Sequence, residues 1–314
     1  MKRLDPLLVG IVAAAALAFV LPARGAFADG FAVAVKLAIA LLFFLYGARL
    51  STQEALKGLT NWRLHGVILA FTFAIYPLIG LLAQPTTAFI SNDLYQGLLF
   101  MSLVPSTVQS SVALTGVARG NVSGAVVAAS VSSLVGVIVT PLLVMWLMGA
   151  GSGVHIDASV FGDIALQLLL PFILGQLAHN FVPRVGKMAK SKATKFVDRG
   201  SIWMVVYSAF SRGVVSGVWS NVSVWEIVFL TVFSCALVAA MLWLTRVVPE
   251  ALRFPREDRI AIQMCGTQKS LATGLPMATV IFGGASLGVL IIPLMIYHMS
   301  QLVICSAYVS RLSR

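Results

Sequence analysis

Long apolar runs, repeated along the whole chain with short polar connections between them, constrain what this sequence can fold into. The chain has 314 residues, of which 59% are hydrophobic and 11% charged, and its mean hydropathy is +0.95. A soluble domain of this length would carry about a quarter charged residues. Because a helix needs about 20 apolar residues to span a bilayer, the sequence predicts an all-α polytopic membrane protein and excludes an ordinary soluble enzyme.

The apolar runs can be counted with a window of about 19 residues. We predict ten transmembrane helices within a single transmembrane domain over residues 1–314, with spans near 5–22, 31–50, 66–83, 94–116, 121–149, 160–181, 199–216, 222–245, 259–280 and 285–310.

The net charge of +11 is explained by where the basic residues lie. With the N-terminus inside, ten spans place all but four of the 22 Lys and Arg residues in inner connections. The exceptions are Arg24 and Arg212 in outer connections, and Lys36 and Lys269 within apolar stretches. This bias is the positive-inside pattern. We therefore expect the cell inner membrane as location, both termini in the cytoplasm and no nucleic-acid partner.

The first 30 residues imitate a signal peptide. Lys2 and Arg3 precede the first apolar run, and Ala26-Phe27-Ala28 resembles a cleavage site. Because the chain is rich in later spans, we expect the first helix to be retained.

An internal repeat relates the two halves of the chain. The segment Gln109–Gly116 resembles Gln268–Gly274 apart from one extra residue, and five spans separate the two. Because five is an odd number of spans, the second copy enters the membrane from the opposite side and is inverted. We therefore predict two inverted five-helix repeats, at about 5–149 and 160–310.

Both repeat segments lie beside residues that weaken helices. Such breaks are tolerated where the freed backbone groups face protein or a water-filled cavity, and two of them near the midplane suit a small ion or the charged end of a substrate. The alternative, that small residues only allow close packing, fits single residues better than it fits Gln109 and Gln268, whose amides are costly to bury unpaired. The weakening residues are Pro105, Ser106, Thr107, Gly266, Gly274 and Pro276.

Lys269 is the most informative single residue. An ammonium near the middle of an apolar stretch, with no Asp or Glu in the same stretch, is a functional candidate, and its alternative is snorkelling to an interface. Lys36 lies near the end of its stretch, where snorkelling is the better account. His298 and Gln301 in the last stretch are read as packing residues, with titration of His298 as the alternative.

Enzyme and metal signatures are absent from the sequence. It contains no GxSxG, HExxH or Walker motif and no carboxylate pair in one span. Cys235, Cys265 and Cys305 lie far apart, without CxxC spacing. We expect no enzyme activity, no disulfide, no zinc site and no cofactor.

The residues around the two breaks resemble a known family. Pro105 with its Ser/Thr-rich break, followed by Ala118-Arg119-Gly120-Asn121, resembles the fourth-to-fifth-span signature of the bile acid:sodium symporter family. The segment Cys265–Ser270 resembles the ninth-span break of that family and most closely its sodium/bile acid cotransporter 7 branch. The resemblance covers nearly the whole chain. It implies a panel domain, a core domain with crossing broken helices 4 and 9, and a substrate lying between the domains.

The chain departs from the family at positions that hold sodium. Met264 stands where the better-understood carriers place a glutamate, and Ser110-Ser111 replaces a Ser-Asn pair. Thr72 matches a glutamine, and two hydroxyl ligands fall on Ala125 and Ala129. Lys269 enters beside the retained Gln268, so we expect the family-type sodium sites to be degraded, with Ser110, Ser111 and Gln268 as residual sodium candidates.

These observations predict a secondary transporter of a small organic anion that works by alternating access, with Lys269 replacing bound sodium or pairing with the substrate. The alternative is a non-transporting membrane regulator that keeps the fold. Besides the substrate, the bilayer is the expected partner, and a monomer fits the sequence. The candidate binding residues are Thr72, Thr107, Gln109, Ser110, Ser111, Met264, Cys265, Thr267, Gln268, Lys269, Ser270 and His298.

Overall fold

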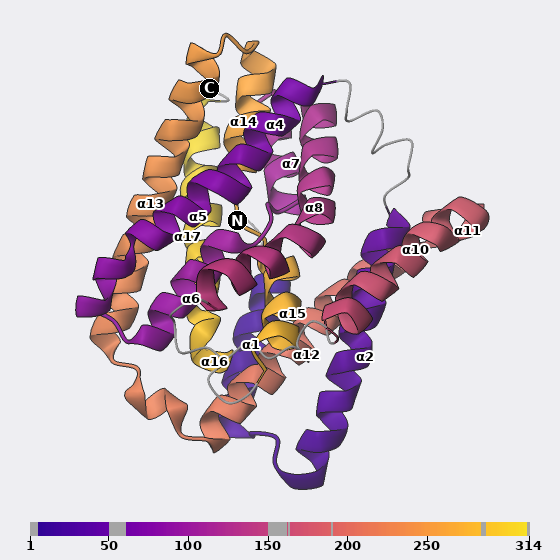
Figure 1. The fold of residues 1–314 in the computed structure, drawn as a ribbon, viewed down its shortest axis with the longest axis vertical. Coiled ribbons are helices and arrows are strands. Elements are labelled where there is room, and N and C mark those ends of the chain that lie inside the picture. The colour runs from indigo at the N-terminus through magenta and orange to yellow at the C-terminus, as the bar shows by residue number, and fades with distance from the viewer. Residues whose placement is uncertain are drawn as a thin grey trace. The chain divides into compact units, whose positions relative to one another are not determined.

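A computed structural model describes residues 6–49, 61–149, 162, 164–189, 191–283 and 287–312, and the regular structure in these ranges is helical (Figure 1). All candidate binding residues lie within the described ranges. Some of the basic residues assigned to the inner side lie outside them, namely Lys2, Arg3, Lys57, Lys190 and Arg314.

Among the described residues, five helical segments are long and apolar enough to cross a membrane, which agrees with a multi-pass membrane protein. The count of ten spans and the inverted repeat stay predictions. Two of the predicted stretches, 94–116 and 259–280, are each divided into two shorter helices. The five segments are Gly25–Arg49, Trp62–Ala88, Val122–Met148, Val224–Ala251 and Leu287–Leu312.

The chain forms two compact units, each built from separate stretches of sequence. Unit 1 comprises Met1–Thr52, His155–Val222 and Leu275–Val289, and unit 2 comprises Gln53–Val154, Ser223–Gly274 and Leu290–Arg314. Each unit therefore combines segments from both halves of the chain. Helix α15 (Leu271–Ile281) begins in unit 2 and continues into unit 1, and α16 (Leu287–Leu290) crosses the boundary in the other direction.

Unit 1 contains a close pair of helices, α2 and α10, which run side by side in Figure 1. A Cβ added to Gly47 would collide with the Phe172 carbonyl group, and one added to Gly175 would collide with the Phe44 carbonyl group. Reciprocal glycines of this kind let two backbones approach closely. The unit consists of α1 (Pro6–Val20), α2 (Gly25–Arg49), the π-helical turn η4 (Ala165–Leu169), α10 (Leu170–Phe181), α11 (Pro183–Ala189), α12 (Lys192–Val215), η5 (Val218–Asn221), the end of α15 and most of α16.

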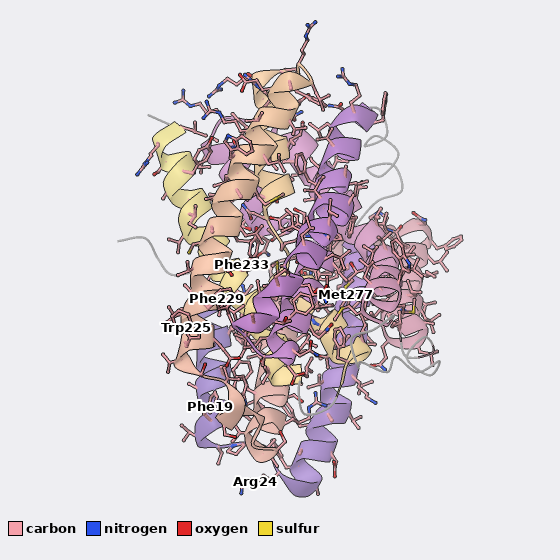
Figure 2. The ribbon with its side chains drawn as sticks, turned by 60° about the vertical axis from the view of Figure 1, so that its left-hand side comes forward. Phe19, Arg24, Trp225, Phe229, Phe233 and Met277 are labelled. Carbon is pink, nitrogen blue, oxygen red and sulfur yellow. The ribbon has the colours of Figure 1, made fainter. Side chains whose placement is uncertain are left out.

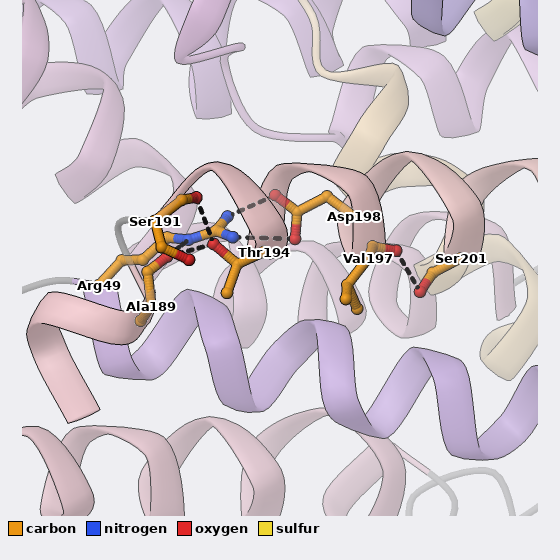
Figure 3. A network of polar contacts seen from close by, with 7 residues as sticks. All are labelled: Arg49, Ala189, Ser191, Thr194, Val197, Asp198 and Ser201. Carbon is orange, nitrogen blue, oxygen red and sulfur yellow. Dashed lines mark hydrogen bonds and ion pairs between the residues drawn. The ribbon is translucent and has the colours of Figure 1, made fainter. Parts of the chain in front are cut away.

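An ion pair joins three helices of unit 1 (Figure 3). Arg49, the last residue of α2, contacts both carboxylate oxygens of Asp198 in α12, at 2.7 and 3.0 Å. Its Nε donates to the carbonyl oxygen of Ala189 at the end of α11, at 2.7 Å. One guanidinium thereby fixes α11 and α12 against α2.

Unit 2 carries the two divided helices. Its α13 presents Trp225, Phe229 and Phe233 at successive turns (Figure 2), and Phe229 stacks on Phe89 with ring centroids 5.4 Å apart. The unit consists of α4 (Trp62–Ala70), the π-helical turn η2 (Phe71–Ile75), α5 (Tyr76–Leu82), η3 (Gln84–Ala88), α6 (Asn92–Leu103), α7 (Gln109–Val117), α8 (Val122–Gly149), α13 (Val224–Ala251), α14 (Arg256–Thr267), the start of α15, and α17 (Ile292–Leu312).

Both π-helical turns lie directly before a proline. The turn η2 precedes Tyr76-Pro77, and η4 precedes Leu170-Pro171. Proline lacks an N–H, and its ring clashes with the carbonyl group four residues earlier in an α-helix. A widened turn relieves that clash, and such turns often mark functional sites.

We expect Arg49→Met to destabilise the protein by about 2 kcal/mol, because it leaves the buried Asp198 carboxylate uncompensated. Arg259→Met is the matched control, since the Arg259–Glu250 pair is 3.2 Å apart with side chains 34% and 58% exposed, and such pairs contribute at most about 1 kcal/mol. The measurement is the thermal unfolding midpoint in detergent micelles. Equal shifts in both variants would contradict the structural role of Arg49.

Candidate functional site

The two divided helices of unit 2 meet at their interruptions. Residues 104–108 separate α6 from α7, and residues 268–270 separate α14 from α15. The Ser270 N–H donates to the Pro105 carbonyl oxygen at 2.8 Å, and the Ser106 hydroxyl donates to the Cys265 carbonyl oxygen at 2.6 Å. Unwound backbone from two distant parts of the chain is therefore joined at one point.

The first interruption follows from the sequence. Val104 precedes Pro105 and is extended, with φ −74° and ψ 154°, as expected for a residue before proline. The Ser106 N–H finds its acceptor outside the segment, in the Ser132 hydroxyl at 3.1 Å. The interruption predicted around Pro105 is present.

The second interruption is displaced from the residues expected to cause it. Gly266 lies inside α14, while Gly274 and Pro276 lie inside α15, so none of them forms the break. A Cβ on Gly266 would lie 3.1 Å from Thr245 Cγ2, which shows that this glycine serves close packing. The chain leaves the helix at Gln268 instead, with φ −100° and ψ 142°.

Lys269 occupies the centre of the second interruption. Its side chain is fully buried, and its Nζ donates to the carbonyl oxygens of Thr72, Ser102 and Val104 at 2.7–2.8 Å. Three donated bonds use the whole donor set of an ammonium. The Tyr76 ring lies 4.2 Å from Nζ and adds a cation–π contact. Snorkelling is therefore wrong for Lys269, and no donor on Nζ is left for a substrate.

The three carbonyl groups around Lys269 are free for a physical reason. Ser102 and Val104 lie at the C-terminal end of α6, where carbonyls have no intrahelical donor. In η2 the Tyr76 N–H bonds to Phe71 instead of Thr72. In this π-helical register each N–H bonds to the carbonyl five residues earlier, so the donor for Thr72 would be Pro77, which has no N–H. The π-helical turn and the proline together leave the Thr72 carbonyl open for the ammonium.

The C-terminal end of α14 is closed by hydroxyl groups. Tyr76 and Tyr297 both donate to the Thr267 carbonyl oxygen, at 2.5 and 2.9 Å, and their hydroxyls also contact each other. The Thr267 side chain bonds to the Thr245 hydroxyl at 3.0 Å. These bonds satisfy the last carbonyl of α14 without a bound ion.

The two N-terminal ends at the interruptions differ. At α15 the Ser270 hydroxyl caps the helix by accepting from the Thr273 N–H at 3.1 Å. At α7 no side chain caps the first turn. The Ser111 hydroxyl donates back to the Thr107 carbonyl, and the Ser110 hydroxyl donates to Gln268 Oε1. The first N–H groups of α7 therefore lack an intrahelical partner.

Gln268 places one more unpaired donor beside this end. The residue is 1% exposed, and its Nε2 has no hydrogen-bond partner among the described residues. Its Oε1 accepts from Ser110, the second residue of α7, so the amide lies at the first turn of that helix. Unpaired N–H groups, the positive end of a helix dipole and a buried amide donor form an anion-binding arrangement.

The remaining candidate residues lie either at the two interruptions or in the helices around them. The Thr107 hydroxyl lies 3.4 Å from the Ser110 hydroxyl and belongs to the first interruption. Met264 and Cys265 are fully buried in α14. His298 contacts the peptide of Lys269 from α17. Gln109 is exposed at the start of α7, so the expectation that its amide is buried is wrong, because the first helical turn directs that side chain outward.

The motif at 118–121 ties the two divided helices together away from their interruptions. The Asn121 side chain donates to Asp258 at 2.7 Å, and its N–H donates to the Glu257 carbonyl oxygen at 2.9 Å. Asn121 also caps α8 by accepting from the Gly124 N–H at 2.8 Å. The connection after α7 is thus fixed to the first turn of α14.

Sequence reasoning missed two residues that complete the site, Tyr76 and Tyr297, and named Ser106 only as a residue that weakens the helix. A tyrosine directly before the proline in an apolar stretch was the available signal for Tyr76. No cluster of three or more His, Cys, Asp or Glu residues suited to a metal exists among the described residues. The residual sodium candidates Ser110, Ser111 and Gln268 stay predictions.

Comparisons with known proteins agree on one family. The model of the SBF-like CPA transporter family matches residues 5–314. A Pseudomonas aeruginosa protein named "Uncharacterized protein PA2026" is 43% identical over 99% of this chain and 93% of its own length. The Escherichia coli (strain K12) protein "Putative symporter YfeH" is 40% identical over 100% of this chain and 94% of its own length. "Sodium/bile acid cotransporter 7" of Danio rerio is 30% identical over 86% of this chain and 81% of its own length.

We expect Lys269→Met to lower the free energy of unfolding by roughly 3 kcal/mol or more, because three buried carbonyl groups lose their donor. Lys36→Met is the matched control, since Lys36 is exposed on α2 and is expected to change stability by less than about 0.5 kcal/mol. Thermal unfolding of the two variants in the same detergent compares them. A shift for Lys269→Met no larger than that of the control would refute the carbonyl contacts.

Proposed function

The chain belongs to the SBF-like CPA transporter family, and on that premise we propose that it is a secondary transporter that moves a small organic anion across the cell inner membrane. A transporter family with apolar helices of spanning length makes the chain a multi-pass membrane protein and not an enzyme. The relatives named as a putative symporter and as sodium/bile acid cotransporters support a carrier.

One observation carries the choice of an anion. Four half-helix ends meet at the interruptions of unit 2, and three of them are closed by groups of the chain itself. Lys269 closes α6, the tyrosine hydroxyls close α14, and Ser270 closes α15. The N-terminus of α7 has no side-chain cap, and beside it lies Gln268 Nε2, a donor without a hydrogen-bond partner among the described residues. A carboxylate, sulfate or sulfonate group supplies the acceptor oxygens that these donors require.

Lys269 stands in for bound sodium in this proposal. Its ammonium holds three carbonyl oxygens, which are the kind of ligand that an alkali cation uses. At the position of the family glutamate, Met264 is fully buried and supplies no oxygen. A sodium ion about 4 Å from the ammonium would be repelled by about 4 kcal/mol at an effective dielectric constant of 20. The expected loss of the sodium sites is therefore consistent with a cation that is part of the chain.

The two units support transport by alternating access. We assign unit 2, with both divided helices, to the core domain and unit 1 to the panel domain, because each draws on both halves of the chain as an inverted repeat requires. Ten spans with both termini in the cytoplasm fit the bias of the basic residues. A regulator without transport would have no use for the buried unpaired donor of Gln268.

Gln268→Glu tests the anion site. We expect at least a tenfold loss of affinity for the anion, because an isosteric carboxylate removes the donor and repels the ligand by about 1.4 kcal/mol or more. Gln263→Glu is the control, since Gln263 is also buried in α14 but bonds to Leu242 and Tyr308. Binding is measured as thermal stabilisation by a panel of carboxylates, sulfates and conjugated sterols. Stabilisation of Gln268→Glu equal to that of the wild type would exclude the site.

Replacing sodium by choline tests the role of Lys269. We expect uptake of the anion into proteoliposomes to persist in choline, because the required cation is part of the chain. A steep sodium requirement would refute the stand-in role. Unchanged transport in Lys269→Met would also refute the stand-in role.

A further inference from the structure

The peptide group of Lys269 is held by a side chain from another helix. The Lys269 N–H donates to Gln301 Oε1 at 2.8 Å, and Gln301 Nε2 donates to the Lys269 carbonyl oxygen at 2.9 Å. Gln301 is fully buried in α17. One amide therefore satisfies both backbone groups of a residue that has left the helical ladder.

This pairing explains why the chain stays unwound at Lys269. Residues 268–270 lie between two helices, and a buried backbone group without a partner is unfavourable. Gln301 supplies the donor and the acceptor that a continuous helix would otherwise supply. A rewound segment would carry Lys269 Nζ away from its three carbonyls and Gln268 away from the first turn of α7.

The direction of the bonds also fixes the orientation of the Gln301 amide and the proton on His298. Because the Lys269 N–H requires an acceptor, Oε1 must face it, and Nε2 faces both the Lys269 carbonyl and His298 Nδ1, which is 2.8 Å away. Nδ1 must therefore accept, so the neutral ring carries its proton on Nε2. His298 lies one turn before Gln301 on α17 and holds the amide in this orientation.

We propose that Gln301, oriented by His298, is the positioning residue of the transport site, which sets the Lys269 ammonium and the Gln268 amide by clamping the Lys269 peptide. This inference rests on the proposed function for its effect on anion binding, but the clamp itself exists without a ligand. Gln301 acts through its neighbours and does not touch the anion.

Hydrogen–deuterium exchange tests the clamp directly on the full-length protein. We expect Gln301→Met to raise exchange in peptides covering 268–274 by about tenfold, because the Lys269 amide loses its acceptor. Gln263→Met is the matched control: it removes another buried glutamine of unit 2 that bonds to a backbone carbonyl, at 2.8 Å from Leu242, but does not touch the interruption. Unchanged exchange in Gln301→Met, or an equal rise in Gln263→Met, would overturn the proposal.

If Gln301→Met does not fold, His298→Leu provides a second variant. It removes the acceptor that orients the amide, so exchange over 268–274 should rise by less than in Gln301→Met but above the wild type. No rise in His298→Leu would overturn the orienting role.

Measuring the affinity for an anion distinguishes a positioning role of Gln301 from a general effect on stability. We expect Gln301→Met to weaken the affinity for an anion that stabilises the wild type, and the double variant with Gln268→Glu to be no weaker than Gln268→Glu alone, within about twofold. Fully additive losses would overturn action through the Gln268 amide. If no anion binds the wild type, the proposed function fails, while the exchange measurement still decides the clamp.

Discussion

The bonds between the Lys269 ammonium and three backbone carbonyls are the interaction on which the rest of unit 2 depends. A fully buried ammonium is tolerated only with its donors satisfied, and its acceptors come from two other segments, η2 and the end of α6. Pro105 interrupts α6, Pro77 frees the Thr72 carbonyl, and Gln301 keeps the second interruption open. Together these departures from regular helix place the Lys269 ammonium among its three carbonyl acceptors.

The four helix ends at the interruptions differ in how their free backbone groups are bonded. The two carbonyl ends at the interruptions are neutralised within the chain, by a cation at α6 and by hydroxyl groups at α14. Of the two N–H ends, only that of α15 has a side-chain cap. The start of α7 therefore keeps N–H groups without a side-chain cap, at the positive end of a helix dipole. The proposed anionic substrate rests on this polarity.

The class of protein and the presence of two interrupted helices could be predicted from the sequence, because long apolar runs and breaks at prolines are local signals. Pro105 next to Ser106 and Thr107 predicted the first interruption correctly. Gly266 and Pro276 did not mark the second, since they weaken helices but are tolerated where packing requires them, whereas the segment Cys265–Ser270, identified by its family resemblance, contains the break at 268–270. The actual cause is Gln301, more than 30 residues away in the chain, whose partner is a backbone group and leaves no mark in the local sequence. The burial of Lys269 was predicted as one alternative, but its carbonyl acceptors depend on a π-helical turn that only tertiary structure reveals.

A cation that is covalently part of the carrier has an electrical consequence. A sodium ion that enters with an anion cancels its charge, whereas Lys269 returns with the empty carrier, so each cycle moves the net charge of the substrate alone. Moving one elementary charge across 100 mV corresponds to about 2.3 kcal/mol. With the cell interior negative, this work opposes the entry of an anion and favours its exit. On the proposed function, replacing an exchangeable ion by a lysine therefore turns the membrane potential into a force that drives export.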